Sequence, residues 1–194
     1  LDNVLTFTAH VSFVVGSATR MLGVISRITK HFNNPASLVR LFCALVRSRL
    51  EFASVAWNAL NKTQALNIEN VQKRLIRIVY DRYSQRRFYF DYEFLLTKVS
   101  MTNLSDRRAE RDLVFFHKLV NGVSDSGSLL SDVNLHVPSR PTRNHCTFYI
   151  NTVCDLSPLS RCQLVFNRIN NAEVDIFSDS RVFAMKMKVL VANL

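Results

Sequence analysis

The 194-residue chain has little of the residues that define several protein classes. It contains 4 glycines and 4 prolines, which excludes collagen-like and linker-dominated sequences. Its 4 cysteines do not form a disulfide framework pattern, so we interpret them as reduced thiols of an intracellular protein, nuclear or cytoplasmic. No apolar run approaches the roughly 20 residues of a membrane span, because the best stretch, 38–46, is interrupted by Arg40. Asp2 stands where a signal peptide has positive charge, and the initial Leu favours a piece of a longer protein.

Signatures of catalysis and metal binding are also missing. The sequence has no adjacent Asp pair, no Gly-rich phosphate loop and no Gly-x-Ser-x-Gly elbow, so an independent enzyme is the least favoured class. The five histidines are scattered and are predicted to be core or interface residues. Cys146, Cys154 and Cys162 lie eight residues apart, near His136 and His145, whereas zinc ligands are usually paired two to four residues apart. We therefore expect ordinary thiols, no metal site and no cofactor.

Positive charge is what the sequence has in excess. It contains 25 Lys and Arg against 15 Asp and Glu, a net charge of +10, with an ordinary globular content of 48% hydrophobic residues. The excess is concentrated in the first half, with 13 basic and 6 acidic residues in 1–97 against 12 and 9 in 98–194. Such a balance indicates a polyanionic partner, either nucleic acid or an acidic membrane surface.

Apolar residues at three- and four-residue steps predict a mainly α fold. We expect Asn34-Pro35 to separate the first two helices, Thr63 to cap the third, and Gly122 to end a later one. Residues 121–161 are predicted to be irregular, with a possible strand at 146–153. We expect a thumb-like helical domain over 1–85 and a helical C-terminal region over 86–194. The helices are predicted over 7–32, 36–57, 64–80, 92–99, 102–122 (or from 105), 158–170 and 178–191.

Two of these helices carry detailed expectations. In 7–32 the apolar stripe is predicted to extend to Ile28 and Phe32. In 36–57 Arg49 falls near the stripe, so either it is buried with a partner or the helix bends there. The stripe predicted for 36–57 consists of Leu38, Leu41, Phe42, Leu45, Phe52 and Ala56.

Three groups of basic residues are predicted to lie away from apolar helix faces. Guanidinium groups bind phosphate through paired hydrogen bonds, and basic helix faces contact a nucleic-acid backbone without reading its sequence. One such stripe alone is more often a solvated face, but three stripes with a +10 excess favour nucleic-acid contact. The candidate residues are Arg20 and Arg27, then Lys73, Arg74 and Arg77, then Arg107, Arg111 and Lys118.

The segment 82–90 interleaves arginines with aromatic residues and has no helical period. Arg82, Arg86 and Arg87 alternate there with Tyr83, Phe88 and Tyr89. Stacking plus charge is typical of single-strand or RNA contact, but a hinge whose aromatic residues pack between two parts of the chain fits equally well.

Residues 45–57, LVRSRLEFASVAW, resemble the "LVRSxLEYxSxVW" signature of LINE-type, jockey-like non-LTR retrotransposon reverse transcriptases. Further segments resemble that family in the same order. Leu5, Phe7 and His10 match "LxFxxH", 20–23 match "RxLG", and 68–74 match "IExVQRR". Residues 107–122 match "RR…DLxFxxKLxNG", and the tail matches at 136–138, 157–161 and 175–177. The resemblance covers essentially the whole chain.

The resemblance implies the thumb and C-terminal region of a reverse transcriptase. Its partners would be RNA or an RNA–DNA hybrid and the palm and fingers of the parent protein, with no membrane and no small-molecule substrate. The paired aspartates of the palm are missing, so the chain is not expected to polymerise alone, and Mg²⁺ would belong to the palm. Phe52 replaces the usual Tyr, and no Cys–His knuckle follows. The alternatives are a helical protein-interaction module and a retrotransposon remnant without function.

Overall fold

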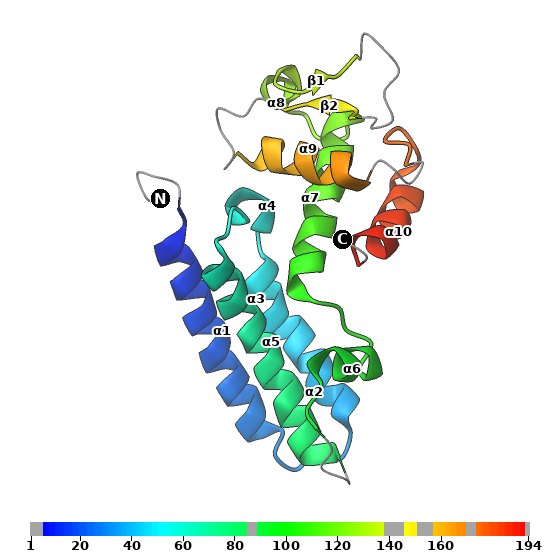
Figure 1. Cartoon of the computed structure of the whole chain (residues 1–194). Helices are drawn as coiled ribbons and strands as arrows, with labels where there is room; N and C mark the ends of the chain where they lie inside the picture. Colours follow the sequence, from blue (N-terminus) through cyan, green and yellow to red (C-terminus); the bar gives the residue numbers. More distant parts are fainter. Residues whose placement is uncertain (1–5, 85–88, 138–145, 151–156, 170–173, 193–194) are drawn as a thin grey trace. The chain divides into compact units, whose positions relative to one another are not determined.

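The computed structural model describes residues 6–84, 89–137, 146–150, 157–169 and 174–192. The fold is mainly helical, as predicted (Figure 1). The chain forms two compact units. Unit 1 comprises Leu1–Ala53 and Leu60–Ser105, and unit 2 comprises Ser54–Ala59 and Asp106–Leu194.

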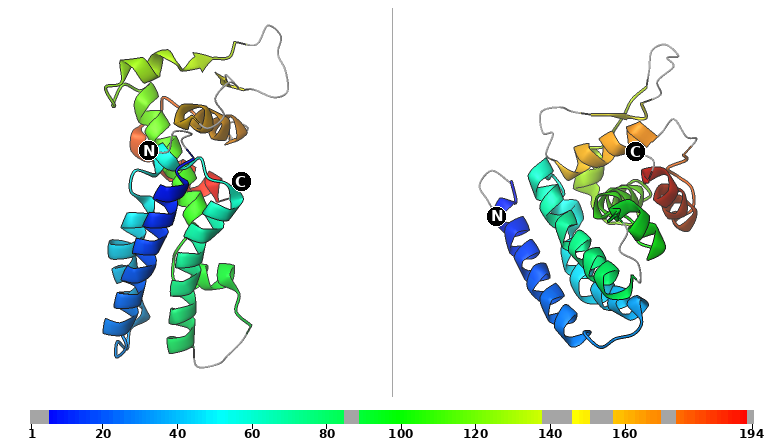
Figure 2. Two further views of the ribbon diagram at one scale, coloured as in Figure 1. Left: turned by 90° about the vertical axis from the view of Figure 1, so that its left-hand side faces the viewer. Right: turned by 60° about the horizontal axis from the view of Figure 1, so that its bottom comes forward.

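Unit 1 is built on two long parallel helices, α1 (Thr8–Ile28) and α5 (Lys62–Tyr83). Gln64 Nε2 donates to Thr8 Oγ1 over 3.1 Å at one end, and Arg82 Nη2 donates to Ser26 Oγ over 2.9 Å at the other. Both contacts join residues 56 positions apart, so the two helices run in register. Between them in the sequence, α2 (Pro35–Phe42), the π-helical turn η1 (Cys43–Arg47) and α3 (Ser48–Glu51) return in the opposite direction (Figures 1 and 2).

The helix predicted over 36–57 is interrupted twice. Leu38, Phe42, Val46 and Leu50 are all buried, and four-residue steps overshoot an α-helical turn by about 40° each. The π turn of η1 has more residues per turn than an α-helix, which compensates for this angular shift. Val46 and Leu50 therefore stay on the buried side. The prediction was wrong for Leu45 and Phe52, which are 41% and 77% exposed, and for Ala56, which is also exposed.

The second interruption follows α3, where Ala53 has a left-handed φ of 49°. Residues after it form α4 (Ser54–Trp57), which belongs to unit 2. Arg49 is exposed, and its Nη1 donates to Ser17 Oγ over 3.1 Å. Of the two alternatives for Arg49, a departure from regular helix is the one observed, because the π turn displaces Arg49 from the buried stripe.

The first helix ends earlier than predicted, and its buried stripe is shorter. Val11, Ala18, Leu22 and Ile25 are buried, but Ile28 and Phe32 are exposed, which corrects the predicted stripe. By length and composition α1 is also apolar enough to cross a membrane, contrary to the expectation from the sequence. Its buried stripe packs against the other helices of unit 1, as core helices of the same composition do.

Helix starts in unit 1 depend on asparagine. Asn34 Oδ1 accepts from Ala36 N over 2.8 Å, with Pro35 at the first helical position, as predicted. For α5 the predicted cap, Thr63, was wrong. Asn61 Oδ1 accepts from Gln64 N over 2.8 Å while Gln64 Oε1 accepts from Asn61 N over 2.9 Å, which is a complete capping box.

Unit 1 extends to Ser105, beyond the domain boundary expected at residue 85. The short helix α6 (Tyr92–Lys98) packs on α5 through a polar network. The Tyr92 hydroxyl donates to Glu69, and Gln72 Nε2 donates to Tyr92 Oη over 3.1 Å and to Thr102 O over 3.0 Å. Burial, together with the hydrogen bond and charge of Glu69, raises the pKa of the Tyr92 phenol above its ordinary value.

Unit 2 is organised around α7 (Leu104–Val120), whose first two residues belong to unit 1. The helix ends at Val120, and Gly122 terminates it as the C′ residue, as predicted. Gly122 has a φ of 67°, and Val123 N donates to Lys118 O over 2.9 Å, which is a Schellman motif. Around α7 lie α4, α8 (Gly127–Ser131), α9 (Pro158–Ile169) and α10 (Ser180–Val191).

The core of unit 2 is aromatic. Phe116, Phe148 and Phe166 pack edge-on or tilted, with ring centroids 4.8 to 6.2 Å apart. Phe148 lies in β2 (Phe148–Tyr149), which pairs antiparallel with β1 (Asn134–Leu135). This strand falls within the predicted 146–153, of which 151–153 lie outside the described residues.

Candidate nucleic-acid interface

The outer side of α1 carries two of the predicted phosphate ligands. Arg20 and Arg27 are exposed and lie seven residues apart, about 10 Å along the helix axis. A Cβ added at Gly16 would lie 3.7 Å from Arg20 Nη1, so the guanidinium lies along the helix surface over Gly16. In the part of the chain that the structure describes, neither arginine forms an ion pair.

The exposed side of α5 carries the second predicted group. Arg74 and Arg77 are exposed, and Lys73 is half-buried. Lys73 Nζ lies 5.1 Å from the centre of the Tyr92 ring, and the Arg77 guanidinium lies 4.9 Å from that of Phe90. Cation–π contacts of this kind hold a cation in place without neutralising it. Lys73 and Arg77 are thus positioned by aromatic neighbours, whereas Arg74 is open to solvent.

The parallel register brings the two groups to the same level of unit 1. With the 56-residue offset of the end contacts, Arg20 lies level with residue 76, next to Arg77. Arg74 lies level with Ala18 on the same basis. The two groups, which are separated in the sequence, therefore lie at the same level of two neighbouring parallel helices. We call them together the α1–α5 basic face (Arg20, Arg27, Lys73, Arg74 and Arg77).

The surroundings of this face are poor in negative charge. Between Asp2 and Glu51 the sequence contains six Lys and Arg residues and no Asp or Glu, and Glu51 is buried. Asp81 is an exposed acidic residue of α5. On the α1 side, positive charge without carboxylates nearby in the sequence raises the local potential that attracts a polyanion, whereas α5 carries Glu69 and Asp81 as well as its basic residues.

The third predicted group, on α7, differs from the other two. Arg111 and Lys118 are exposed, whereas Arg107 is half-buried. Arg107 and Arg111 each interact with other groups of the chain. This group lies in unit 2, whereas the α1–α5 basic face lies in unit 1.

A buried charge cluster in unit 2 was not found from the sequence. Asp112 accepts from Arg161 Nε over 2.9 Å and from Asn58 Nδ2 over 2.8 Å, and Asn58 Oδ1 accepts from Arg108 Nε over 2.9 Å. Arg161 Nη2 also donates to Val55 O. Burial raises the pKa of the Asp112 carboxyl, and the hydrogen bond and charge of Arg161 oppose that rise. We assign a structural role to this cluster, since it binds α4 to α7 and α9.

Two residues of the segment 82–90 have a structural role. Arg82 belongs to α5, and its guanidinium donates to Ser26 and Thr29 at the end of α1. The Tyr83 hydroxyl donates to Phe32 O over 2.7 Å. Tyr89 is 93% exposed, and 85–88 lie outside the described residues. Arg82 and Tyr83 therefore pack within unit 1 and not between two parts of the chain, so the hinge interpretation does not hold for them.

The candidate metal ligands do not come together among the described residues. Cys162 is buried and its Sγ donates to Asp112 O over 3.3 Å, whereas Cys146 is exposed. Cys154 and His145 lie outside the described residues. Within the described ranges no group of three His, Cys, Asp or Glu residues could hold a metal ion. His117 is a core residue, as expected, with Nε2 2.8 Å from Ser178 O.

The chain matches no protein-family model, no curated protein and no solved structure. The features of the chain that bear on function are therefore the α1–α5 basic face and the sequence resemblance.

Proposed function

We propose that the chain binds a nucleic-acid backbone through the α1–α5 basic face and has no catalytic activity of its own. The observation that carries this proposal is the exposure of Arg20, Arg27 and Arg74 on neighbouring parallel helices, without ion pairs among the described residues. Arginines in this arrangement donate paired hydrogen bonds to phosphate oxygens. Recognition of this kind is insensitive to base sequence and depends strongly on salt.

The preferred ligand is an RNA–DNA hybrid, as a template–primer, or the RNA of a retroelement. This choice is supported by the resemblance of the sequence to non-LTR retrotransposon reverse transcriptases, in which the chain would correspond to the thumb and C-terminal region. In that setting the palm and fingers of the parent protein would supply the catalytic metal ions. The chain would hold the duplex.

The test is binding of the purified chain to an RNA–DNA hybrid, repeated from about 50 to 200 mM salt. We expect the affinity to fall by orders of magnitude over this range. Charge reversal at Lys73 and Arg77 should flatten the slope of log K against log salt by roughly one to two units. Binding that is absent, or indifferent to salt, in a folded sample would refute the proposal.

A second candidate function, a protein-interaction module, is favoured by one observation. Val182, Met185 and Val189 are exposed apolar residues at three- and four-residue steps on α10, so they share one helix face. This function predicts concentration-dependent self-association or partner binding, with no salt-sensitive binding of nucleic acid.

A further inference from the structure

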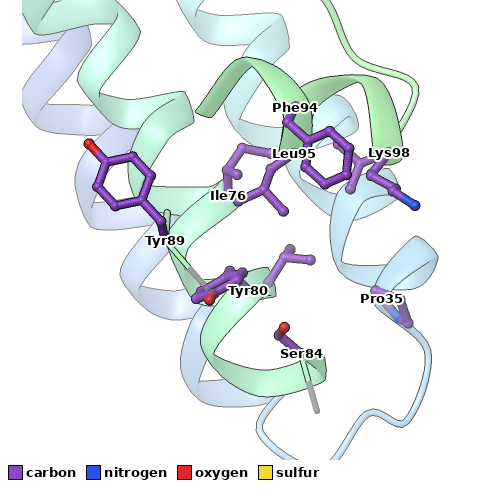
Figure 3. Close-up of a pocket in the computed structure, with 10 residues that line it drawn as sticks. Pro35, Ile76, Tyr80, Ser84, Tyr89, Phe94, Leu95 and Lys98 are labelled. Atoms are coloured by element: carbon purple, nitrogen blue, oxygen red, sulfur yellow. The ribbon is translucent and has the colours of Figure 1, made fainter. Parts of the chain in front are cut away.

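An apolar hollow of about 360 Å³ lies in unit 1 between α5, α6 and the start of α2. Ile76, Leu95, the rings of Tyr80 and Phe94, and Lys98 line it, and Tyr89 lies at its margin with its ring turned outward (Figure 3). We call it the aromatic pocket. The volume is within the range of small-ligand sites.

Two of the aromatic residues that line this pocket are exposed to solvent. Tyr89 is 93% exposed and Phe94 is 57% exposed. Tyr80 is held by an edge-on contact with Phe90, at 5.9 Å between ring centroids. Phe90 in turn lies under the Arg77 guanidinium, so the pocket adjoins a residue of the α1–α5 basic face.

Positive charge continues from the pocket along a second hollow of about 370 Å³. Both hollows are lined by Pro35, Lys98 and Val99, and the second is also lined by Arg40. Lys98 Nζ lies 5.3 Å from the centre of the Phe94 ring. Among the described residues that line the two hollows there is no Asp or Glu.

We propose that the aromatic pocket binds an unpaired nucleobase of a single-stranded segment, while Lys98 and Arg40 contact the adjoining phosphates. Aromatic faces beside cations are how proteins bind single strands without reading sequence. An apolar peptide would fill the pocket equally well but would leave the cations of the second hollow unmatched. The inference rests on the proposed function and adds a single-strand site to it.

The experiment compares two probes that differ only in their bases. Both are RNA–DNA hybrids with a short single-stranded tail, made of thymidines in one and of abasic nucleotides in the other, so the number of phosphates is the same. The wild-type chain should bind the thymidine tail about tenfold more tightly. Tyr89→Ala and Phe94→Ala should each remove most of this preference. Tyr89→Ala, which leaves the contact between Lys98 and Phe94 intact, should also keep the affinity for the abasic probe.

Matched controls are Tyr149→Ala and Phe177→Ala, which remove exposed aromatic rings from unit 2 and should keep the preference. Equal, salt-dependent binding of both probes by the wild type would overturn the pocket proposal and leave the proposed function standing. No binding of either probe would instead refute the proposed function. If Tyr89→Ala and Phe94→Ala abolish self-association in sedimentation without changing the probe preference, a second copy occupies the pocket and the proposal is wrong.

Discussion

The α1–α5 basic face makes a quantitative prediction when three of its arginines are neutralised together. The variant is Arg20→Gln, Arg27→Gln and Arg74→Gln. These side chains are exposed and form no ion pair among the described residues, so glutamine removes charge without leaving a buried partner. We therefore expect the fold to remain intact, which far-UV circular dichroism checks.

The magnitude follows from counterion release. Each phosphate contact contributes about 0.9 to the slope of log K against log salt, so three contacts contribute roughly 2.7. Over the fourfold range from about 50 to 200 mM, the wild-type affinity should fall roughly 40-fold more than that of the variant. Fluorescence anisotropy with a labelled RNA–DNA hybrid measures both slopes.

A matched variant separates contact from overall charge. Arg181→Gln, Lys186→Gln and Lys188→Gln also removes three positive charges, all from exposed positions of α10. At about 150 mM salt charges separated by more than roughly 8 Å are screened, so this variant should keep a slope near that of the wild type. If both variants flatten the slope equally, or if neither does, the assignment of phosphate contact to the α1–α5 basic face is refuted.

Three further predictions concern the fold. Asp112→Asn should lower the free energy of unfolding by about 3–5 kcal/mol, measured in urea, because it leaves the Arg161 guanidinium without its counter-ion. Replacing both partners, with Asp112→Leu and Arg161→Met in one chain, should recover most of this loss. Asn61→Ala should cost about 1 kcal/mol through loss of the capping box, whereas Thr63→Ala, at the second residue of α5, should leave the urea midpoint unchanged. Burial and the charge of Asp112 raise the pKa of Cys162 to about 12, so iodoacetamide should modify the exposed Cys146 in the native protein and Cys162 only after unfolding. Because the folded-state pKa of Cys162 is raised, its contribution to stability is present below the ordinary thiol pKa and is lost as the pH rises toward about 12.

The helical class and most helix positions could be predicted because amphipathic periodicity is a local property. Asn34-Pro35 and Gly122 were correctly predicted as helix boundaries, since each acts through its own backbone and the next few residues. The two breaks in 36–57 have no such signal. No Gly or Pro occurs in residues 36–57. The π turn goes with the four-residue spacing of the buried residues, and the second break lies where the chain passes from unit 1 to Ser54 and Trp57, which are buried in unit 2.

The candidate site was predicted in part. The helical period alone predicts that four of the arginines are exposed, and the structure agrees: Arg20, Arg27, Arg74 and Arg77. The juxtaposition of α1 with α5 was not predictable, because it depends on contacts between residues 56 positions apart. The hydrogen bonds from Arg82 of α5 to Ser26 and Thr29 at the end of α1 depend on the same packing.

The interleaving of the two units along the chain has a consequence for how the protein emerges from the ribosome. Ser54–Ala59 belongs to unit 2 but is synthesised before the second half of unit 1. Domains normally fold in order from the N-terminus. Here α1 can form its contacts only after α5 has been synthesised, and α4 only after Arg161 has been synthesised. A cut at Ser105 would therefore not yield two self-sufficient halves. The C-terminal fragment would lack Asn58 and the Val55 carbonyl, both of which its buried charge cluster requires.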